Sequence, residues 1–190
     1  GFVFALVTGA QFIETGAHNR VMVIGADKMS AILDMEDRST CVLFGDGAGA
    51  VVYSTDFEHG EVLSTSLHAD GGGYDIMYQT AGGSETPVTP EHLEANEHKL
   101  VIRGREVYKF AVNRLVELVR REQSNNPELV LGGVVPHQVN LRIIESARER
   151  LDLSADRIFT NIQRYGNTSS ASVPVALDEA RRTGFMSEMD

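Results

Sequence analysis

The chain has 190 residues, of which 42% are hydrophobic, and this composition is typical of a soluble globular protein. Its formal net charge of −10, without a stretch that interleaves basic and aromatic residues, disfavours nucleic acid as a partner. No apolar run approaches the roughly 20 residues of a membrane span, and a single cysteine excludes an internal disulfide framework and favours the cytoplasm.

The first predicted element is a helix over residues 2–15 that is apolar on every side, and Gly16 occupies the position that closes it. A helix of this kind is typically buried in a large core. Because a natural amino terminus is rarely so apolar, we expect the chain to be a piece of a longer protein. Three strands are expected to follow, at residues 20–25, 41–44 and 50–54.

The glycine-rich segment 45–49 could suggest a nucleotide-binding loop. Its spacing is not G-x-G-x-x-G, however, and the element that follows is rich in β-branched residues rather than helical. We therefore reject nucleotide binding, and the Asp-Gly pair predicts a tight backbone turn instead.

The second part of the chain alternates strands and helices again. A strand at 61–68 is followed by a glycine- and proline-bearing excursion, 69–96, whose length favours a functional loop. The remaining predicted elements are a long amphipathic helix at 99–122, a strand at 130–136, a helix at 141–151, a strand at 157–162 and a helix at 172–182. This alternation predicts an α/β protein with a mixed, largely parallel sheet covered on both faces.

Charge is distributed unevenly along the chain. Residues 56–98 hold nine carboxylates and no Lys or Arg, whereas residues 99–121 hold seven basic residues. This asymmetry predicts a basic face that could attract an acidic partner or hold phosphates. The alternative is a solvated helix face balanced by its neighbours.

Two other sets of side chains suggest chemistry that the context disfavours. His68, Asp70 and Asp75 could be metal ligands, but no second cluster accompanies them and we predict no metal site. The order Cys41, His137, Asn167 is that of papain-like peptidases, whose thiol lies at a helix amino terminus. Cys41 lies in an apolar predicted strand, which is typical of a small buried hydrophobe.

Two strand-to-helix junctions carry the residues that best indicate a function. His137 follows the strand at 130–136, and Asn167 stands thirty positions later, after the strand at 157–162. Because carboxyl ends of neighbouring strands lie side by side in an α/β sheet, both side chains are expected in one cleft. A neutral imidazole and an amide can donate two hydrogen bonds to an oxygen that becomes negative. The alternative is a core histidine and a helix cap.

These junctions resemble β-ketoacyl-ACP synthase III, a thiolase-like condensing enzyme. The similar segments, in the order of that family, are Asp-Arg-Ser-Thr at 37–40, Phe-Gly-Asp-Gly-Ala-Gly-Ala at 44–50, His-Gln-x-Asn-Leu-Arg at 137–142 and Gly-Asn-Thr-Ser-Ser-Ala-Ser at 166–172. The resemblance implies a layered αβαβα fold with mixed, mostly parallel sheets. Residues 1–56 would end its N-terminal half, and residues 57–190 would form most of its C-terminal half.

The resemblance also implies an activity. It is a decarboxylative Claisen condensation of an acyl-CoA primer with malonyl-ACP, which initiates fatty-acid synthesis in a cytoplasmic homodimer. No cofactor is implied, since the coenzyme A thioester is a substrate. The nucleophilic cysteine of the family would stand just before Gly1, and further strands would follow Asp190, so the chain is expected to be a fragment.

Site residues follow from the same resemblance. His137 and Asn167 would be catalytic, and Arg142 would face the acyl carrier protein. Residues that would bind the substrate and coenzyme A are Arg38, Ser39, Gly104, Arg105, Tyr108 and Asn140. Two of these depart from the family, which often has Gly where Ser39 stands and usually Asn where Arg105 stands. Two alternatives stay open: a related condensing enzyme of polyketide or secondary metabolism, and a non-catalytic acyl-carrier or coenzyme A binding protein.

Overall fold

The computed structural model describes residues 1–56 and 60–186. The predicted boundary between the two halves, after residue 56, falls next to residues 57–59, which lie outside the described residues. None of the described helices is both long and apolar enough to cross a membrane.

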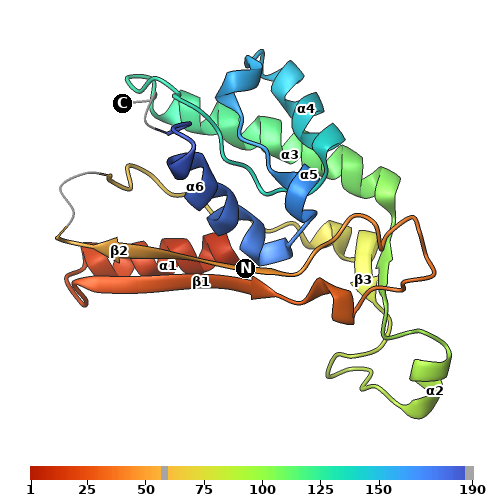
Figure 1. The fold of residues 1–190 in the computed structure, drawn as a ribbon. Helices are drawn as coiled ribbons and strands as arrows, with labels where there is room; N and C mark the ends of the chain where they lie inside the picture. The colour runs from red at the N-terminus through yellow and green to blue at the C-terminus, as the bar shows by residue number, and fades with distance from the viewer. Residues whose placement is uncertain (57–59, 187–190) are drawn as a thin grey trace.

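The N-terminal part is a two-stranded antiparallel sheet with one helix along it (Figure 1). Its elements are α1 (Phe2–Glu14), β1 (Arg20–Asp27) and β2 (Gly47–Ser54). The two strands pair along their whole length, from Arg20 opposite Ser54 to Asp27 opposite Gly47. Helix α1 approaches β1 so closely that a Cβ on Gly9 would lie 2.9 Å from a methyl group of Val23. These elements confirm the predicted helix and two of the three predicted strands.

The predicted strand at 41–44 is wrong. After the short 3-10 helix η1 (Met29–Ala31) the chain turns, and only Phe44 makes an isolated parallel bridge, to Asn167. The Asp37 carboxylate accepts hydrogen bonds from the Ser39 amide at 2.9 Å and from the Thr40 hydroxyl at 2.7 Å. Such side-chain acceptors compete with a strand ladder for the backbone, which the apolar composition of 41–44 does not reveal.

The segment 60–102 also differs from its prediction. Residues 61–68 are irregular rather than a strand, and the excursion after them is more ordered than expected. It contains the 3-10 helix η2 (Gly71–Ile76), strand β3 (Met77–Gln79) and helix α2 (Pro90–Glu94), and it ends in strand β4 (Leu100–Ile102). β4 pairs antiparallel with β3, so the helix predicted from residue 99 begins only at Gly104. Figure 1 shows the lobe around α2 projecting away from the rest of the molecule.

The C-terminal part is mainly helical. Its elements are α3 (Gly104–Asn125), α4 (Leu141–Arg150), η3 (Ala155–Arg157), α5 (Ile162–Tyr165), η4 (Ser169–Ala171) and α6 (Ser172–Arg182). α3 and α4 lie side by side (Figure 1), and Val112, Ile143 and Ile144 are buried on them. α6 packs on β2, where a Cβ on Gly49 would lie 2.9 Å from Pro174.

The predicted strands at 130–136 and 157–162 shrink to one parallel bridge between Val134 and Ile158. The amide of Val134 donates to the carbonyl of Arg157, and the amide of Phe159 donates to the carbonyl of Val134, both at 2.9 Å. The α/β class is confirmed. Parallel pairing, however, is confined in the described residues to this bridge and the one at Phe44, whereas both sheets are antiparallel. Parallel neighbours come from distant parts of a chain, so strand and helix alternation alone does not identify them.

Candidate active site

His137 stands at the turn between the extended segment that ends at Pro136 and helix α4. Its Nδ1 atom shares a hydrogen bond with the hydroxyl of Ser172, the first residue of α6. Burial lowers the pKa of His137. Solvent still reaches the ring, although protein atoms surround it closely enough to strip much of its hydration. The neutral imidazole is therefore favoured, and the start of α1 lies near it.

Gln138 locks the His137 junction to the second junction. The side chain is only 1% exposed. Its Nε2 donates to the carbonyls of Pro136 at 2.9 Å and Phe159 at 3.3 Å, and its Oε1 accepts from the amide of Asn161 at 3.0 Å. Every side-chain hydrogen bond of Gln138 leads to the backbone of one junction or the other, so this side chain ties the two junctions together. The sequence analysis missed this role, although a polar residue beside His137 at a strand end was a visible signal.

Asn161 links the second junction to helix α6. Its side-chain amide donates to the Glu179 carboxylate at 2.8 Å, and Glu179 also forms an ion pair with Arg164 on α5. Asn161 is 2% exposed, so the amide is satisfied inside the protein. The lock therefore joins the second junction to the helix that carries Ser172.

Asn167 is held at both its backbone and its side chain. Its amide donates to the carbonyl of Leu43 at 2.8 Å, and its carbonyl accepts from the amide of Gly45 at 3.0 Å. Its Oδ1 accepts from the amide of Ser169 at 2.9 Å, which fixes the carboxamide so that the Nδ2 hydrogens point the other way. The Asn167 side chain thus accepts a hydrogen bond as a helix cap does, which was the alternative interpretation. Its Nδ2 donor is not used by this contact.

Glycines allow the backbone around Asn167 to lie directly on the N-terminal part. A Cβ at Gly45 would lie 2.1 Å from the carbonyl oxygen of Tyr165, and one at Gly25 would lie 2.4 Å from the carbonyl oxygen of Ser170. No side chain fits at these distances. The glycine-rich segment therefore serves close backbone approach beneath the site.

Asp27, at the end of β1, is a second residue that the sequence analysis missed. Its carboxylate accepts from the Ser170 hydroxyl at 2.5 Å and from the Ser170 amide at 2.8 Å. These hydrogen bonds lower the pKa of Asp27. Ser169, beside them, has a φ of +51°, which is an uncommon conformation for a residue with a side chain. The ionised Asp27 thus fastens the turn that follows Asn167.

Three of the predicted binding residues lie around α4. The side chain of Asn140 caps the helix by accepting from the amide of Arg142 at 2.9 Å, and the Arg142 side chain is exposed. The Tyr108 hydroxyl on α3 shares a 2.6 Å hydrogen bond with Ser146 on α4. Asn140 and Tyr108 therefore have structural partners of their own, and Arg142 is free to meet solvent.

The other predicted binding residues lie at the surface. Arg38 and Ser39 are exposed, and the Ser39 hydroxyl is bound to Asp37 at 2.6 Å. Gly104 begins α3, where a Cβ would meet no atom within 4 Å, and Arg105 after it is exposed. Within the described residues, no hydrogen bond joins any of these four to His137 or Asn167.

The contacts of Cys41 and His137 are not those of a papain-like triad. The sulfur of Cys41 lies 3.8 Å from the carbonyl oxygen of Met35, in a turn rather than a buried strand. His137 bonds Ser172 instead. The three imagined metal ligands, His68, Asp70 and Asp75, each contact a different arginine, which are Arg121, Arg114 and Arg103 in that order. No group of three or more potential ligands is arranged to hold a metal in residues 1–56 and 60–186.

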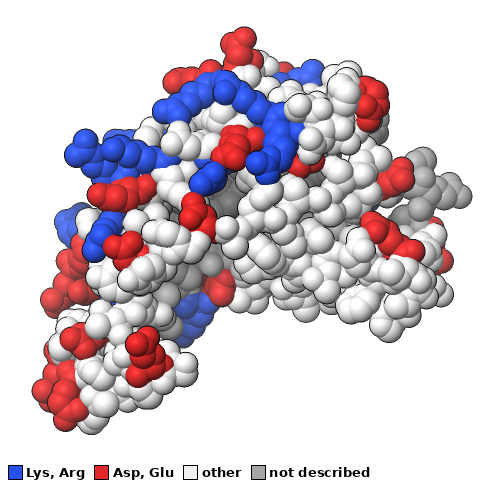
Figure 2. Space-filling model, turned by 180° about the vertical axis from the view of Figure 1, so that it is seen from behind, with Lys and Arg blue, Asp and Glu red and all other residues white. Residues whose placement is uncertain are grey.

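Through these ion pairs, the acidic segment 56–98 contacts arginines of the basic segment 99–121. Figure 2 shows Lys and Arg interspersed with Asp and Glu along one side of the molecule, and acidic groups alone on the projecting lobe in that view. The basic face that the sequence predicted is therefore partly neutralised within the chain by Asp70 and Asp75.

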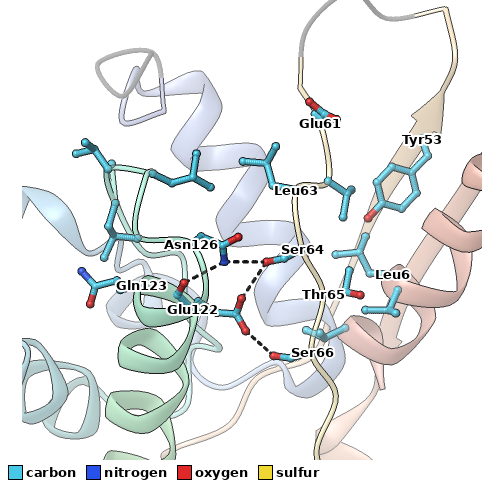
Figure 3. A pocket seen from close by; sticks show the side chains of 17 residues that line it. Leu6, Tyr53, Glu61, Leu63, Ser64, Thr65, Ser66, Glu122, Gln123 and Asn126 are labelled. Atoms are coloured by element: carbon cyan, nitrogen blue, oxygen red, sulfur yellow. Dashed lines mark hydrogen bonds between the residues drawn. The ribbon is translucent and has the colours of Figure 1, made fainter.

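A cavity of about 590 Å³ lies elsewhere, between α1, residues 61–66, the end of α3 and residues 129–132 (Figure 3). Ser64 and Ser66 donate to the Glu122 carboxylate at 2.9 and 2.7 Å. Neither His137 nor Asn167 lines this cavity. Two carboxylates line the cavity: Glu122, which these hydroxyls bind, and the exposed Glu61.

Comparisons with known proteins agree on one family. The family model described as 3-Oxoacyl-[acyl-carrier-protein (ACP)] synthase III matches residues 1–71, and the model of its C-terminal part matches residues 129–190. The chain is 44% identical to a beta-ketoacyl-[acyl-carrier-protein] synthase III of Caldanaerobacter subterraneus, with 100% of this chain and 58% of the relative covered. It is 45% identical to the synthase III of Xylella fastidiosa, with 97% and 56% covered.

Solved structures give the same result. The 3-oxoacyl-[acyl-carrier-protein] synthase III of Aquifex aeolicus superposes with a TM-score of 0.82 at 40% identity, with 97% of this chain and 56% of that chain covered. A priming β-ketosynthase of a polyketide biosynthetic pathway superposes with a TM-score of 0.76 at 32% identity, with 97% and 55% covered. The chain thus spans little more than half the length of these relatives. From its sequence, its thiolase-like fold and the order of its two junctions, the chain belongs to the β-ketoacyl-ACP synthase III family.

Proposed function

We propose that the protein containing this chain joins an acyl-CoA primer to a malonyl unit on acyl carrier protein by decarboxylative Claisen condensation, the first step of fatty-acid synthesis. One observation carries the proposal. Both candidate donors are tied at one end to residues 169–172, His137 through Nδ1 and Asn167 through Oδ1. Within the described residues, neither Nε2 of His137 nor Nδ2 of Asn167 has a protein partner. Both donor ends therefore remain available to a ligand, and the proposal is that one thioester oxygen accepts from both.

These donors suit the decarboxylation half-reaction. The carboxylate of the malonyl thioester leaves as carbon dioxide, and the electron pair of the broken C–C bond forms an enolate whose negative charge rests on the thioester oxygen. Hydrogen bonds from His137 and Asn167 would stabilise that oxygen, because preorganised donors favour developing charge. The enolate carbon then attacks the acyl thioester on the enzyme cysteine, and the cysteine leaves as thiolate.

We place that cysteine one or two residues before Gly1 in the longer chain. In support, a Cβ at Gly1 would lie 3.4 Å from Cβ of Ser170, in the turn that follows Asn167. A residue joined to Gly1 would thus lie beside the site. Intact mass and amino-terminal sequencing of the natural protein test this placement, and a natural start at Gly1 would favour the binding-only alternative.

Other properties belong to the same proposal. The enzyme would need no resident cofactor, act in the cytoplasm as a homodimer, and divide after residue 56 into two related halves. Arg38, Ser39, Gly104, Arg105, Tyr108 and Asn140 would line the path of coenzyme A, and Arg142 would face the carrier protein. The exposed positions of Arg38, Arg105 and Arg142 leave these side chains accessible to such ligands.

A role in polyketide initiation is the second candidate, because the priming β-ketosynthase is 32% identical over 97% of this chain. A panel of acyl-CoA primers on the full-length enzyme separates the two. Preference for the short primers of fatty-acid initiation would favour the first candidate, and preference for an unusual starter would favour the second.

The central test is malonyl decarboxylation by His137→Ala and Asn167→Ala variants of the full-length enzyme. Loss of one donor should lower the rate about 10²- to 10³-fold. His18→Ala, at an exposed histidine, is the matched control and should keep the rate. Unimpaired decarboxylation in both site variants would remove the assignment, and binding of acyl-CoA without turnover by the unmodified enzyme would favour a binding protein.

A further inference from the structure

The hydroxyl of Ser172 is a buried group that the proposed mechanism does not yet use. Ser172 is 2% exposed and begins helix α6, directly opposite the His137 junction. Within the residues that the structure describes, its oxygen meets two groups, Nδ1 of His137 and the amide of Gln138 at 3.3 Å.

The proton count of this hydroxyl decides which nitrogen of His137 carries hydrogen. The amide of Gln138 can only donate, so it occupies one lone pair of the Ser172 oxygen. If Nδ1 of His137 also donated, the Ser172 hydrogen would be left without an acceptor in a buried place, which is unfavourable. If Ser172 donates to Nδ1, all three groups are satisfied. A neutral imidazole that accepts at Nδ1 carries its hydrogen on Nε2.

We propose that Ser172 is a positioning residue that selects the tautomer of His137, so that Nε2 carries the hydrogen donated to the thioester oxygen. This inference rests on the proposed function, because it assigns the direction of a hydrogen bond that the decarboxylation step requires. The backbone amide that donates to Ser172 is itself held in place. Gln138 is locked between Pro136, Phe159 and Asn161, so its backbone amide is held toward Ser172.

The test is ¹⁵N NMR of the full-length enzyme with labelled histidine, in which the His137 signals are assigned by their loss in His137→Gln. The expected spectrum at neutral pH has hydrogen on Nε2 in the unmodified enzyme and a mixture of tautomers in Ser172→Ala. Hydrogen on Nδ1 in the unmodified enzyme, or an unchanged tautomer in Ser172→Ala, would overturn the proposal. The tautomer of His137 in the unmodified enzyme tests the proposal even if Ser172→Ala folds poorly.

Kinetics provide the second readout. Ser172→Ala should slow malonyl decarboxylation roughly 10- to 100-fold with little change in KM, since a wrong tautomer removes a donor without removing the binding surface. Ser172→Thr keeps a hydroxyl and should retain more activity. Ser66→Ala removes a half-buried hydroxyl that binds Glu122 and is the matched control. If His137→Ala loses decarboxylation but Ser172→Ala keeps the rate of the unmodified enzyme, the positioning role fails and the proposed function stands. If His137→Ala is active, the proposed function itself fails.

Discussion

His137 shows how a single residue acquires its chemistry from what surrounds it. An isolated imidazole is half protonated near pH 6.5, but burial lowers the pKa of His137 and thereby favours the neutral ring. A neutral ring has one donor and one acceptor, and Ser172 engages Nδ1. The remaining nitrogen is therefore available for a ligand.

The lowered pKa predicts a pH dependence. Because the unfolded chain binds the proton more readily, the contribution of His137 to the free energy of unfolding is fully present above about pH 6.5. It is lost as the pH falls from there through the lowered pKa of the folded state. The ring titration of His137, followed by ¹H NMR, should have a midpoint below about 6.5, and the acid limb of the decarboxylation rate should follow it. A midpoint at or above that value would contradict the burial argument.

At the scale of elements, the site depends on the register between two strand-to-helix junctions. The segment that ends at Pro136 and the segment before Ile162 share only one parallel bridge, so the ladder alone holds them weakly. In place of further ladder hydrogen bonds, the side chain of Gln138 binds the carbonyls of Pro136 and Phe159 and the amide of Asn161. The distance between His137 and the Asn167 turn thus depends on a side chain more than on a sheet.

We predict that Gln138→Ala lowers the free energy of unfolding by about 1–3 kcal/mol, because it leaves buried carbonyls and an amide without partners. The matched control is Gln163→Ala on α5, which is exposed and should change stability by less than about 0.5 kcal/mol. Urea denaturation of both variants measures the difference. If Gln138→Ala and Gln163→Ala were equally stable, solvent or neighbouring backbone would have to replace the hydrogen bonds of the Gln138 side chain.

At the scale of the whole molecule, charge separates into an acidic segment that folds back on a basic one. Asp70 and Asp75 pair with arginines of the basic stretch, and such exposed pairs contribute little to stability. Their larger effect is on the surface potential, since they leave fewer unpaired cations to meet a partner. Arg142, on the first turn of α4, is exposed and has no ion pair within the described residues.

Arg142→Glu is therefore predicted to raise KM for malonyl-ACP roughly 5- to 10-fold, because an exposed charge mainly affects association with a charged partner. The rate of decarboxylation of malonyl-CoA should not change. Arg182→Glu reverses the charge of another exposed arginine and should leave KM unaltered. Steady-state kinetics with both thioesters measure the effect, and an unchanged KM for the carrier-bound substrate would exclude Arg142 from the docking surface.

The sequence by itself determined the family and the α/β class, and it singled out the two proposed donors, His137 and Asn167. Periodicity and turn residues sufficed for α1, β1, α4 and α6, because their apolar faces repeat locally. The tertiary structure decided the rest. It moved the start of the helix predicted from residue 99 to Gly104 by pairing β4 with β3, and it reduced the strands at 130–136 and 157–162 to one bridge. It also revealed the roles of Gln138, Asp27 and Ser172, which have partners 21, 143 and 35 positions away, respectively. Contacts at such separations depend on how elements meet in space, which local patterns do not encode.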